Sequence, residues 1–147
     1  GTEIQPIPDV QGSHMLIVTP NKRVSTAKAF ARINAENLTS EAAESILIVC
    51  RSDAESLDLR HSALRNDIEA AVFAAFPEIE RAKERLIELG AVNALMSGSG
   101  ASVFAVFDKE ETRQTALKAL DDEVNWRKFA VAAISRDEYR ERVYNKR

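Results

Sequence analysis

The sequence predicts an α+β fold, a two-layer sandwich in which an antiparallel, ferredoxin-like sheet of about four strands carries helices on one face. Two observations lead to this class. Short apolar, β-branched runs typical of strands alternate with longer segments whose apolar residues recur at helical spacing. From residue 15 to residue 134 the order is strand, helices, strand, strand, helix, strand. This is the βαββαβ order of ferredoxin-like folds, with extra helices in the first crossover.

Two strands are predicted near the start of the chain. Residues 2–7 alternate weakly between apolar and polar side chains. Residues 15–19 form a compact β-branched run that Pro20 closes. We expect a turn near Gly12 between them, so that residues 1–14 are a strand and a turn at the margin of one domain that spans residues 1–147.

Two helices are predicted in the first crossover. Ser25 or Thr26 caps the first helix, and the second begins near Ser40. Each has an apolar stripe along one face. The stripes are Ala27, Phe30, Ala31 and Ile33 in the first helix and Ala43, Ile46, Leu47 and Cys50 in the second.

The next two helices meet at Pro77. Residues 62–76 carry apolar side chains at helical spacing up to this proline. Asn66 with Glu69 three residues later fits equally well a cap that starts this helix later. Pro77 suits the first turn of the following helix, and Gly90 suits its left-handed exit. The inward residues of that helix are Ile79, Ala82, Leu86 and Ile87.

The hydrophobic period then changes from helical to strand-like. Residues 91–96 and 102–107 are short apolar segments joined by a glycine- and serine-rich connection, which predicts a strand, a loop and a strand. Asp108 with Glu111 predicts a capping pair for a helix, and residues 126–134 predict the last strand. That helix carries Ala116, Leu117 and Leu120 on its apolar face.

The composition is that of an ordinary globular protein. The 147 residues include 20 Lys and Arg against 23 Asp and Glu, a formal net charge of −3, and 45% of them are hydrophobic. Residues 136–147 carry five basic and three acidic side chains and are expected to be a solvated tail. The mild acidity disfavours nucleic-acid binding. No apolar run approaches the roughly 20 residues of a membrane span, so no membrane partner is predicted.

The cysteine and histidine content and the amino terminus bear on metal sites and on the compartment, and they favour a reduced, intracellular protein. Cys50 is the only cysteine, and with His14 and His61 it forms no zinc-ligand spacing, so no metal site is predicted. We find no basic leader with an apolar core, and we expect a cytoplasmic protein. The chain begins with Gly1 rather than Met, which indicates a piece of a longer protein.

The connection at residues 97–102 is the segment that most suggests chemistry. Two glycines among small hydroxyl residues let backbone N–H groups approach a ligand and form an anion-binding nest, for which phosphate is the natural ligand. A plain hairpin connection fits the spacing equally well. No Lys-Ser or Lys-Thr follows as in a P-loop, and the third glycine of a dinucleotide fingerprint is absent. The residues are Ser97, Gly98, Ser99, Gly100, Ala101 and Ser102.

Three segments resemble the GHMP small-molecule kinases in the same order along the chain. Residues 96–105 resemble the glycine-rich signature, in the spelling of the members that act on a cytidine-diphosphate-linked methylerythritol. In addition to these three segments, residues 1–4 resemble the strand that follows the catalytic segment of the kinases' amino-terminal domain. The likeness extends to about residue 134. The other two segments are Thr19-Pro20 followed by Val24-Ser25-Thr26 and Phe30, and Asn66-Asp67-Ile68-Glu69 before a helix.

The resemblance implies the carboxyl-terminal domain of an ATP-dependent kinase with the fold predicted above. The intact enzyme would move the γ-phosphoryl group of ATP to the 2-hydroxyl of that substrate, with Mg²⁺, in the non-mevalonate route to isoprenoids. Its catalytic residues would lie upstream of Gly1, so this chain alone is expected to be inactive. Residues 1–14 would belong to the interface with the amino-terminal domain. The face left uncovered would favour self-association.

By the same resemblance, Thr26 and Phe30 match the cytidine pocket, where an aromatic face stacks on the base and a polar group meets its edge. From spacing alone, Phe30 is a core residue of its helix. Residues 97–102 would face the nucleotide phosphates or brace a phosphate loop of the amino-terminal domain. The segment from Asn66 to Glu69 matches a signature, but its residues predict only a helix cap.

Two other interpretations stay open at this point. A ferredoxin-like regulatory module would hold an anionic small molecule at residues 97–102. A GHMP kinase for another substrate, such as homoserine or mevalonate, would share the fold and differ in its pocket.

Overall fold

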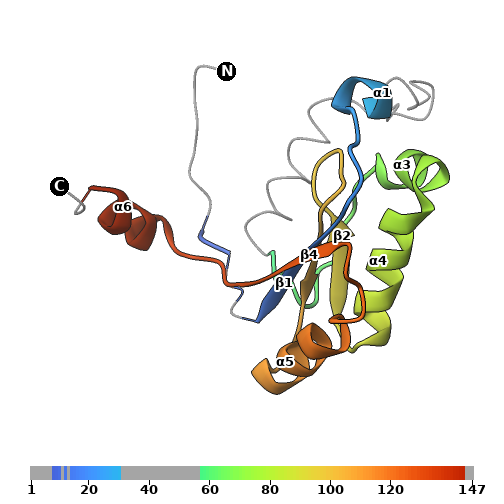
Figure 1. Cartoon of the computed structure of the whole chain (residues 1–147). Helices are drawn as coiled ribbons and strands as arrows, with labels where there is room; N and C mark the ends of the chain where they lie inside the picture. Colours follow the sequence, from blue (N-terminus) through green and yellow to red (C-terminus); the bar gives the residue numbers. More distant parts are fainter. Residues whose placement is uncertain (1–7, 11, 13, 31–56, 145–147) are drawn as a thin grey trace, which may run out of the picture.

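The computed structural model of the chain describes residues 8–10, 12, 14–30 and 57–144 (Figure 1). The predicted strand at residues 2–7 and the predicted helix that begins near Ser40 lie outside the described residues, as does the side chain of Phe30.

A four-stranded antiparallel sheet forms the centre of the molecule. Its strands are β1 (Met15–Pro20), β2 (Asn93–Met96), β3 (Val103–Val106) and β4 (Trp126–Val131). They lie in the order β2-β3-β1-β4, and every neighbouring pair is antiparallel. This confirms the predicted α+β sheet with the strand order of a ferredoxin-like fold.

The strands follow the sequence pattern because one face of the sheet is buried more deeply than the other. Along β1, buried residues alternate with half-buried ones, and Leu16 and Val18 point into the core. Leu16 lies opposite Ala105 of β3 and Ala130 of β4. Ala105 is completely buried beside Leu16, whereas Ala130 is exposed, so the buried part of this face lies over β1 and β3.

The helices α3 (Glu69–Ala75) and α4 (Pro77–Glu88) cover the buried face of the sheet (Figure 1). As predicted, α4 has Pro77 in its first turn and ends before Gly90, whose φ is 92°. It buries Ile79, Ala82 and Leu86 completely. Burial of side chains of this size contributes about 1.5–3 kcal/mol each for the large ones, so α4 is the main hydrophobic support of the sheet.

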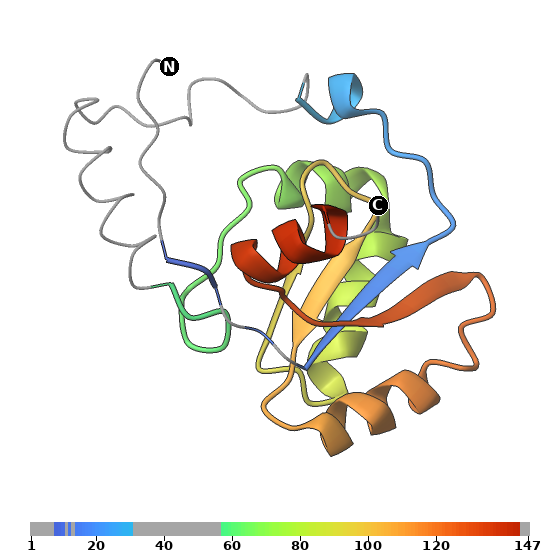
Figure 2. The same ribbon diagram turned by 90° about the vertical axis from the view of Figure 1, so that its left-hand side faces the viewer.

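The other helices of the described residues are α1 (Thr26–Phe30), α5 (Glu110–Ala119) and α6 (Arg136–Tyr144). Figure 2 shows α6 in front of the sheet and α4 behind it. Residues 136–147 were expected to be a solvated tail; the described part of this tail forms α6, and no residue of α6 is buried. Among the described helices, none is long and apolar enough to cross a membrane.

Several local predictions were wrong. Of the two starts considered for the helix before Pro77, residue 62 is wrong and the later start is right: α3 begins at Glu69, because Asn66 Oδ1 accepts a hydrogen bond from the Ile68 N–H group (3.1 Å) and holds a turn there. Ala27, predicted to be buried, is exposed, and Ala29 is buried in its place. Ile87 is also exposed rather than inward.

The predicted capping pair of Asp108 with Glu111 is absent from the described structure. The α5 helix begins at Glu110, and the residue before it, Lys109, is extended (φ −132°, ψ 145°) and makes no side-chain cap bond. Glu111 therefore lies in the first turn as an acidic residue, where it faces the positive end of the helix dipole.

Candidate functional site

The glycine-rich loop connects β2 to β3 at one end of the sheet. Gly98 and Gly100 both have positive φ, 57° and 89°. Gly98 is exposed, and nothing lies within 4 Å of the position that a Cβ atom would take there. At Gly100 a Cβ atom would lie 3.1 Å from Sδ of Met96. The first glycine therefore leaves open space beside the backbone, and the second allows the loop to fold onto the core.

The backbone of the loop is partly closed and partly open. The Ser97 N–H group donates to the Ser102 carbonyl (2.8 Å), and the Gly100 N–H group donates to the Ser97 carbonyl (3.1 Å). None of the described residues accepts a hydrogen bond from the N–H groups of Gly98, Ser99 or Ala101. Gly98 and Ser99 follow one another in the chain, and unused N–H groups on successive residues, one of which has positive φ, are the donors that an anion-binding nest uses.

Two hydroxyl pairs attach the loop to the first part of the chain. Thr19 Oγ1, on β1, lies 2.8 Å from Ser102 Oγ. Thr26 Oγ1, in the first turn of α1, lies 3.0 Å from Ser99 Oγ. The structure therefore brings the predicted substrate residue Thr26 together with the predicted loop, 73 residues later in the sequence.

The second predicted substrate residue is in the same short helix. Phe30 is the last residue of α1, one turn after Thr26, and its side chain lies outside the described part of the chain. A cavity of about 150 Å³ lies beside the helix, between α1 and α3. Arg23, Val24, Ser25, Ala29, Ala71, Val72 and Phe76 line it.

The loop has further partners that sequence reasoning did not find. Asn66 Nδ2 donates to the carbonyls of Met96 and Gly98, both at 2.8 Å. The Met96 N–H group donates to Glu69 Oε1 at 2.7 Å. We predicted a cap from these two residues. Besides the local bond that Asn66 Oδ1 accepts from the Ile68 N–H group, both side chains bond to Met96, about 30 residues later, and no local pattern indicates a contact over that distance.

Asp67, which lies between Asn66 and Glu69 in the sequence, forms an ion pair outside the loop. Its carboxylate pairs with Arg65 Nε at 2.9 Å, and both side chains are exposed. An exposed ion pair of this kind contributes little. Asp67 has no described contact with the loop.

A lysine in the segment before α1 forms an ion pair with a glutamate of α4. Lys22 Nζ pairs with Glu78 Oε2 at 2.9 Å, and the hydrogen bond from Lys22 is the main cause that lowers the pKa of Glu78. Trp126 Nε1 also donates to Glu78. Glu78 therefore stays ionised and keeps the Lys22 side chain on α4.

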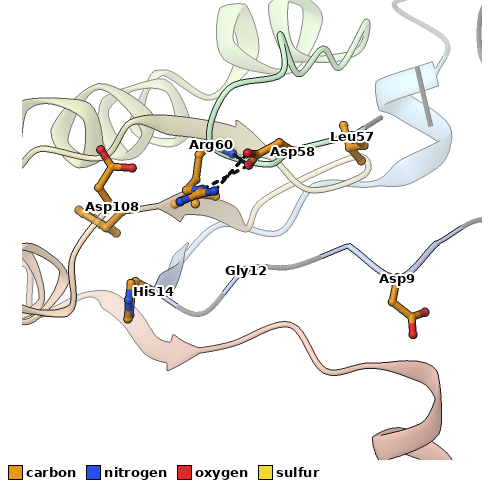
Figure 3. A pocket seen from close by; sticks show the side chains of 9 residues that line it. Asp9, Gly12, His14, Leu57, Asp58, Arg60 and Asp108 are labelled. Atoms are coloured by element: carbon orange, nitrogen blue, oxygen red, sulfur yellow. Dashed lines mark hydrogen bonds and ion pairs between the residues drawn. The ribbon is translucent and has the colours of Figure 1, made fainter. Parts of the chain in front are cut away.

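A larger cavity lies at the opposite end of β1 and β3 from the loop (Figure 3). It has a volume of about 430 Å³ and is lined by Asp9, His14, Asp58, Arg60 and Asp108 among others. Asp58 accepts hydrogen bonds from His61 (2.9 Å) and Arg60, and these lower its pKa. In Figure 3 the Asp9 carboxylate points away from Arg60 and Asp58. The charged groups of this cavity do not converge on one point.

The described residues include no group of three or more His, Cys, Asp and Glu side chains that could hold a metal ion. What the site offers is backbone N–H donors, hydroxyl groups and a small cavity. These groups suit the binding of a phosphate-bearing ligand.

Residues 27–125 match the family described as GHMP kinases C terminal. The 4-diphosphocytidyl-2-C-methyl-D-erythritol kinase of Solidesulfovibrio magneticus is 39% identical over 115 residues, which are 77% of this chain and 39% of that protein. The enzyme of the same name from Solibacter usitatus is 31% identical over 143 residues, 95% of this chain and 44% of that protein. The chain thus spans less than half the length of these curated relatives.

The solved structures agree on the fold. A crystal structure of 4-(cytidine 5'-diphospho)-2C-methyl-D-erythritol kinase superposes with a TM-score of 0.62 at 21% identity, covering 90% of this chain and 46% of that one. The homoserine kinase of Cytophaga hutchinsonii superposes with a TM-score of 0.58 at 21% identity, over 90% of this chain and 44% of its own. At these identities the likeness establishes the fold alone. Since the family match covers residues 27–125 and includes the glycine-rich loop, the chain belongs to the GHMP kinases and corresponds to their C-terminal domain.

Proposed function

We propose that the whole protein containing this chain is an ATP-dependent kinase for the 2-hydroxyl of 4-diphosphocytidyl-2-C-methyl-D-erythritol. This chain would be its C-terminal half, which binds nucleotide and substrate. The observation that carries the proposal is the hydrogen bond of 3.0 Å between Thr26 Oγ1 and Ser99 Oγ. A kinase must hold both of its substrates within reach of each other, and this contact joins the two segments that would bind them.

The glycine-rich loop fits the phosphates of ATP on its own geometry. The N–H groups of Gly98, Ser99 and Ala101 have no acceptor among the described residues, and the space beside Gly98 is open. Backbone donors of this kind stabilise the charge that spreads over phosphate oxygens during phosphoryl transfer. Ser99 and Ser102 are held by Thr26 and Thr19, so their hydroxyl groups fix the loop.

The cytidyl group would bind beside α1. Thr26 would meet the polar edge of the base, and Phe30 would stack on its face. Stacking on an aromatic side chain is worth about 1–3 kcal/mol per base. The cavity between α1 and α3 is lined by Ser25 and Ala29, which are the sequence neighbours of these positions, and it gives room for a ligand beside α1.

The chemistry of the transfer would come from outside this chain. The described residues offer no carboxylate cluster for Mg²⁺. Mg²⁺, when bound to ATP, neutralises phosphate charge. The residues that position the attacking hydroxyl would belong to an amino-terminal half, and the chain covers only 39% and 44% of the two curated relatives. ATP and the cytidyl substrate would be drawn from the cytoplasm, where the enzyme would act.

The test uses the protein extended upstream to the length of its curated relatives. We expect it to phosphorylate the cytidyl substrate with ATP, and we expect the 147-residue chain alone to show no turnover. Thr26→Val removes one hydroxyl, and the loss of one neutral hydrogen bond corresponds to about a fivefold rise in KM for the cytidyl substrate. Thr115→Val is the matched control, because Thr115 is exposed on α5 and bonds only its own helix.

Three results would overturn the proposal. The first is an extended protein that leaves the cytidyl substrate unchanged but phosphorylates homoserine or mevalonate. The second is tight binding of amino acids by calorimetry, which indicates a regulatory module. The third is robust turnover by the 147-residue chain alone, which would place the catalytic groups within it.

A further inference from the structure

The last residue of β2, Met96, has an N–H group and a carbonyl group at the edge of the sheet that no neighbouring strand of the described sheet pairs with. β2 is an edge strand, with β3 as its only neighbour in the described sheet. Ser97 forms a hydrogen-bonded pair with Ser102 across the two strands. Because hydrogen-bonded pairs alternate along an antiparallel ladder, the N–H and C=O groups of Met96 point away from β3. They lie immediately before the glycine-rich loop.

Two side chains take both of these groups. Glu69 Oε1 accepts from the Met96 N–H group at 2.7 Å, and Asn66 Nδ2 donates to the Met96 carbonyl at 2.8 Å. The same Asn66 amide donates to the Gly98 carbonyl, also at 2.8 Å. Together they replace the strand that is missing on this side of β2, and they hold the backbone on both sides of Ser97.

The helix layer in turn fixes Glu69. Lys83 Nζ, on α4, donates to Glu69 Oε2 at 2.6 Å, and the two side chains are only 28% and 14% exposed. Lys83 Nζ also lies 5.8 Å from the centre of the Phe73 ring. A partly buried ion pair is screened less by water than an exposed one. The start of the loop is therefore tied to α3 and, through Lys83, to α4.

We propose that Asn66 and Glu69 are positioning residues of the kinase, which act on the reaction by setting the conformation of the glycine-rich loop. This inference rests on the proposed function, since it assumes that the loop holds phosphate. Neither residue needs to touch a substrate. The N–H groups of Gly98 and Ser99 are aimed by the backbone that the two side chains hold, and a displacement of about 1 Å in such donors can reduce the rate 100-fold.

The chain offers a matched set of variants. Glu69→Ala removes both the bond to Met96 and the ion pair with Lys83. Glu69→Gln loses the ion pair but keeps a carbonyl oxygen that accepts from the Met96 N–H group. Asn66→Ala removes the donors to Met96 and Gly98 and leaves Glu69 in place. Asp67→Ala is the control from the same segment, because its exposed partner is Arg65.

The kinetic test uses the upstream-extended protein. We expect Glu69→Ala and Asn66→Ala to lower kcat/KM for ATP by about 10- to 100-fold, the range of one or two hydrogen bonds to a fixed group. Asp67→Ala should stay within about twofold, and Glu69→Gln should recover most of the activity lost in Glu69→Ala. A purely structural role predicts that the alanine and glutamine variants lose activity alike, since both lack the ion pair. Equal losses, or unchanged kcat/KM in both alanine variants, would overturn the inference.

A second measurement separates this inference from the proposed function. Amide hydrogen exchange in the 147-residue chain reports the Met96 N–H group directly. We expect it to exchange at least about tenfold faster in Glu69→Ala than in Glu69→Gln or Asp67→Ala. Unchanged exchange at Met96 refutes the positioning contact even if the protein is a kinase. Faster exchange at Met96 in Glu69→Ala, combined with an upstream-extended wild-type protein that has no kinase activity, would instead refute the function and leave the contact standing.

Discussion

Substituting Gly100 by alanine tests the conformation of the loop most directly. At a φ of 89° an L-residue lies beyond the left-handed helical region, and such a placement costs about 1–2 kcal/mol. The new methyl group would lie 3.1 Å from Met96 Sδ, 3.5 Å from Val24 Cγ2 and 3.6 Å from Val72 Cγ1. Met96 is only 1% exposed, so its sulfur must shift within a packed core, which adds about 1 kcal/mol. The expected loss of unfolding free energy is therefore about 2–3 kcal/mol.

Gly98→Ala is the matched control within the same loop. Its φ of 57° is the ordinary left-handed value, and no atom lies within 4 Å of the added methyl group. We expect a loss of only about 1 kcal/mol, which is the conformational part alone.

The assay is thermal and urea unfolding of the 147-residue chain, followed by circular dichroism. For a chain of this size 1 kcal/mol corresponds to about 3 °C, so Tm should fall by about 6–9 °C for Gly100→Ala and by about 3 °C for Gly98→Ala. Equal losses in the two variants, or a larger loss in Gly98→Ala, would refute the reasoning from φ and close contact.

Two further predictions concern the charge and the surface of the domain. Hydrogen bonds from Arg113, Gln114 and His14 lower the pKa of Glu110 to about 2, with Arg113 the largest cause. Because the pKa is lower in the folded state, Glu110 stabilises the fold above about pH 4.5 and loses this effect as the pH falls toward 2. The Tm difference between the wild type and Glu110→Gln should thus shrink from pH 7 to pH 3, and a constant difference would contradict this. The second prediction is self-association at high concentration, because large apolar side chains such as Phe129 (50% exposed) and Tyr139 (57%) are open on β4 and α6. Sedimentation should show dimers or larger species that Phe129→Lys reduces, whereas a monomer at every concentration would exclude such a surface.

The elements that local pattern decides could be predicted from the sequence. Pro77 and Gly90 mark the two ends of α4, and the apolar, partly β-branched run at residues 15–19 suits a pleated strand with one buried face. The start of α3 could not be predicted in this way. Leu64 keeps the helical period without being in a helix, because the Asn66 side chain holds a turn between Leu64 and the first residue of α3.

The candidate site could be predicted only in part. The glycine spacing indicated the loop, and the resemblance indicated Thr26. The contact between Thr26 and Ser99 spans 73 residues, and that between Asn66 and Met96 spans 30. Such contacts depend on how the helix layer packs on the sheet, so they follow from the tertiary structure and not from any local period. The same limit explains why Asn66 and Glu69 were expected to cap a helix.

The strand order has a consequence for synthesis of the chain on the ribosome. β1 is an inner strand, yet its residue Met15 pairs with Val106 on one side and with Val131 on the other. At about 5–20 residues per second, β1 waits on the order of 5–20 s before its neighbours are made. During that time Leu16 and Val18, which are fully buried in the finished domain, have no sheet to enter. Among the described strands, β1 is therefore the segment that a chaperone would have most reason to hold.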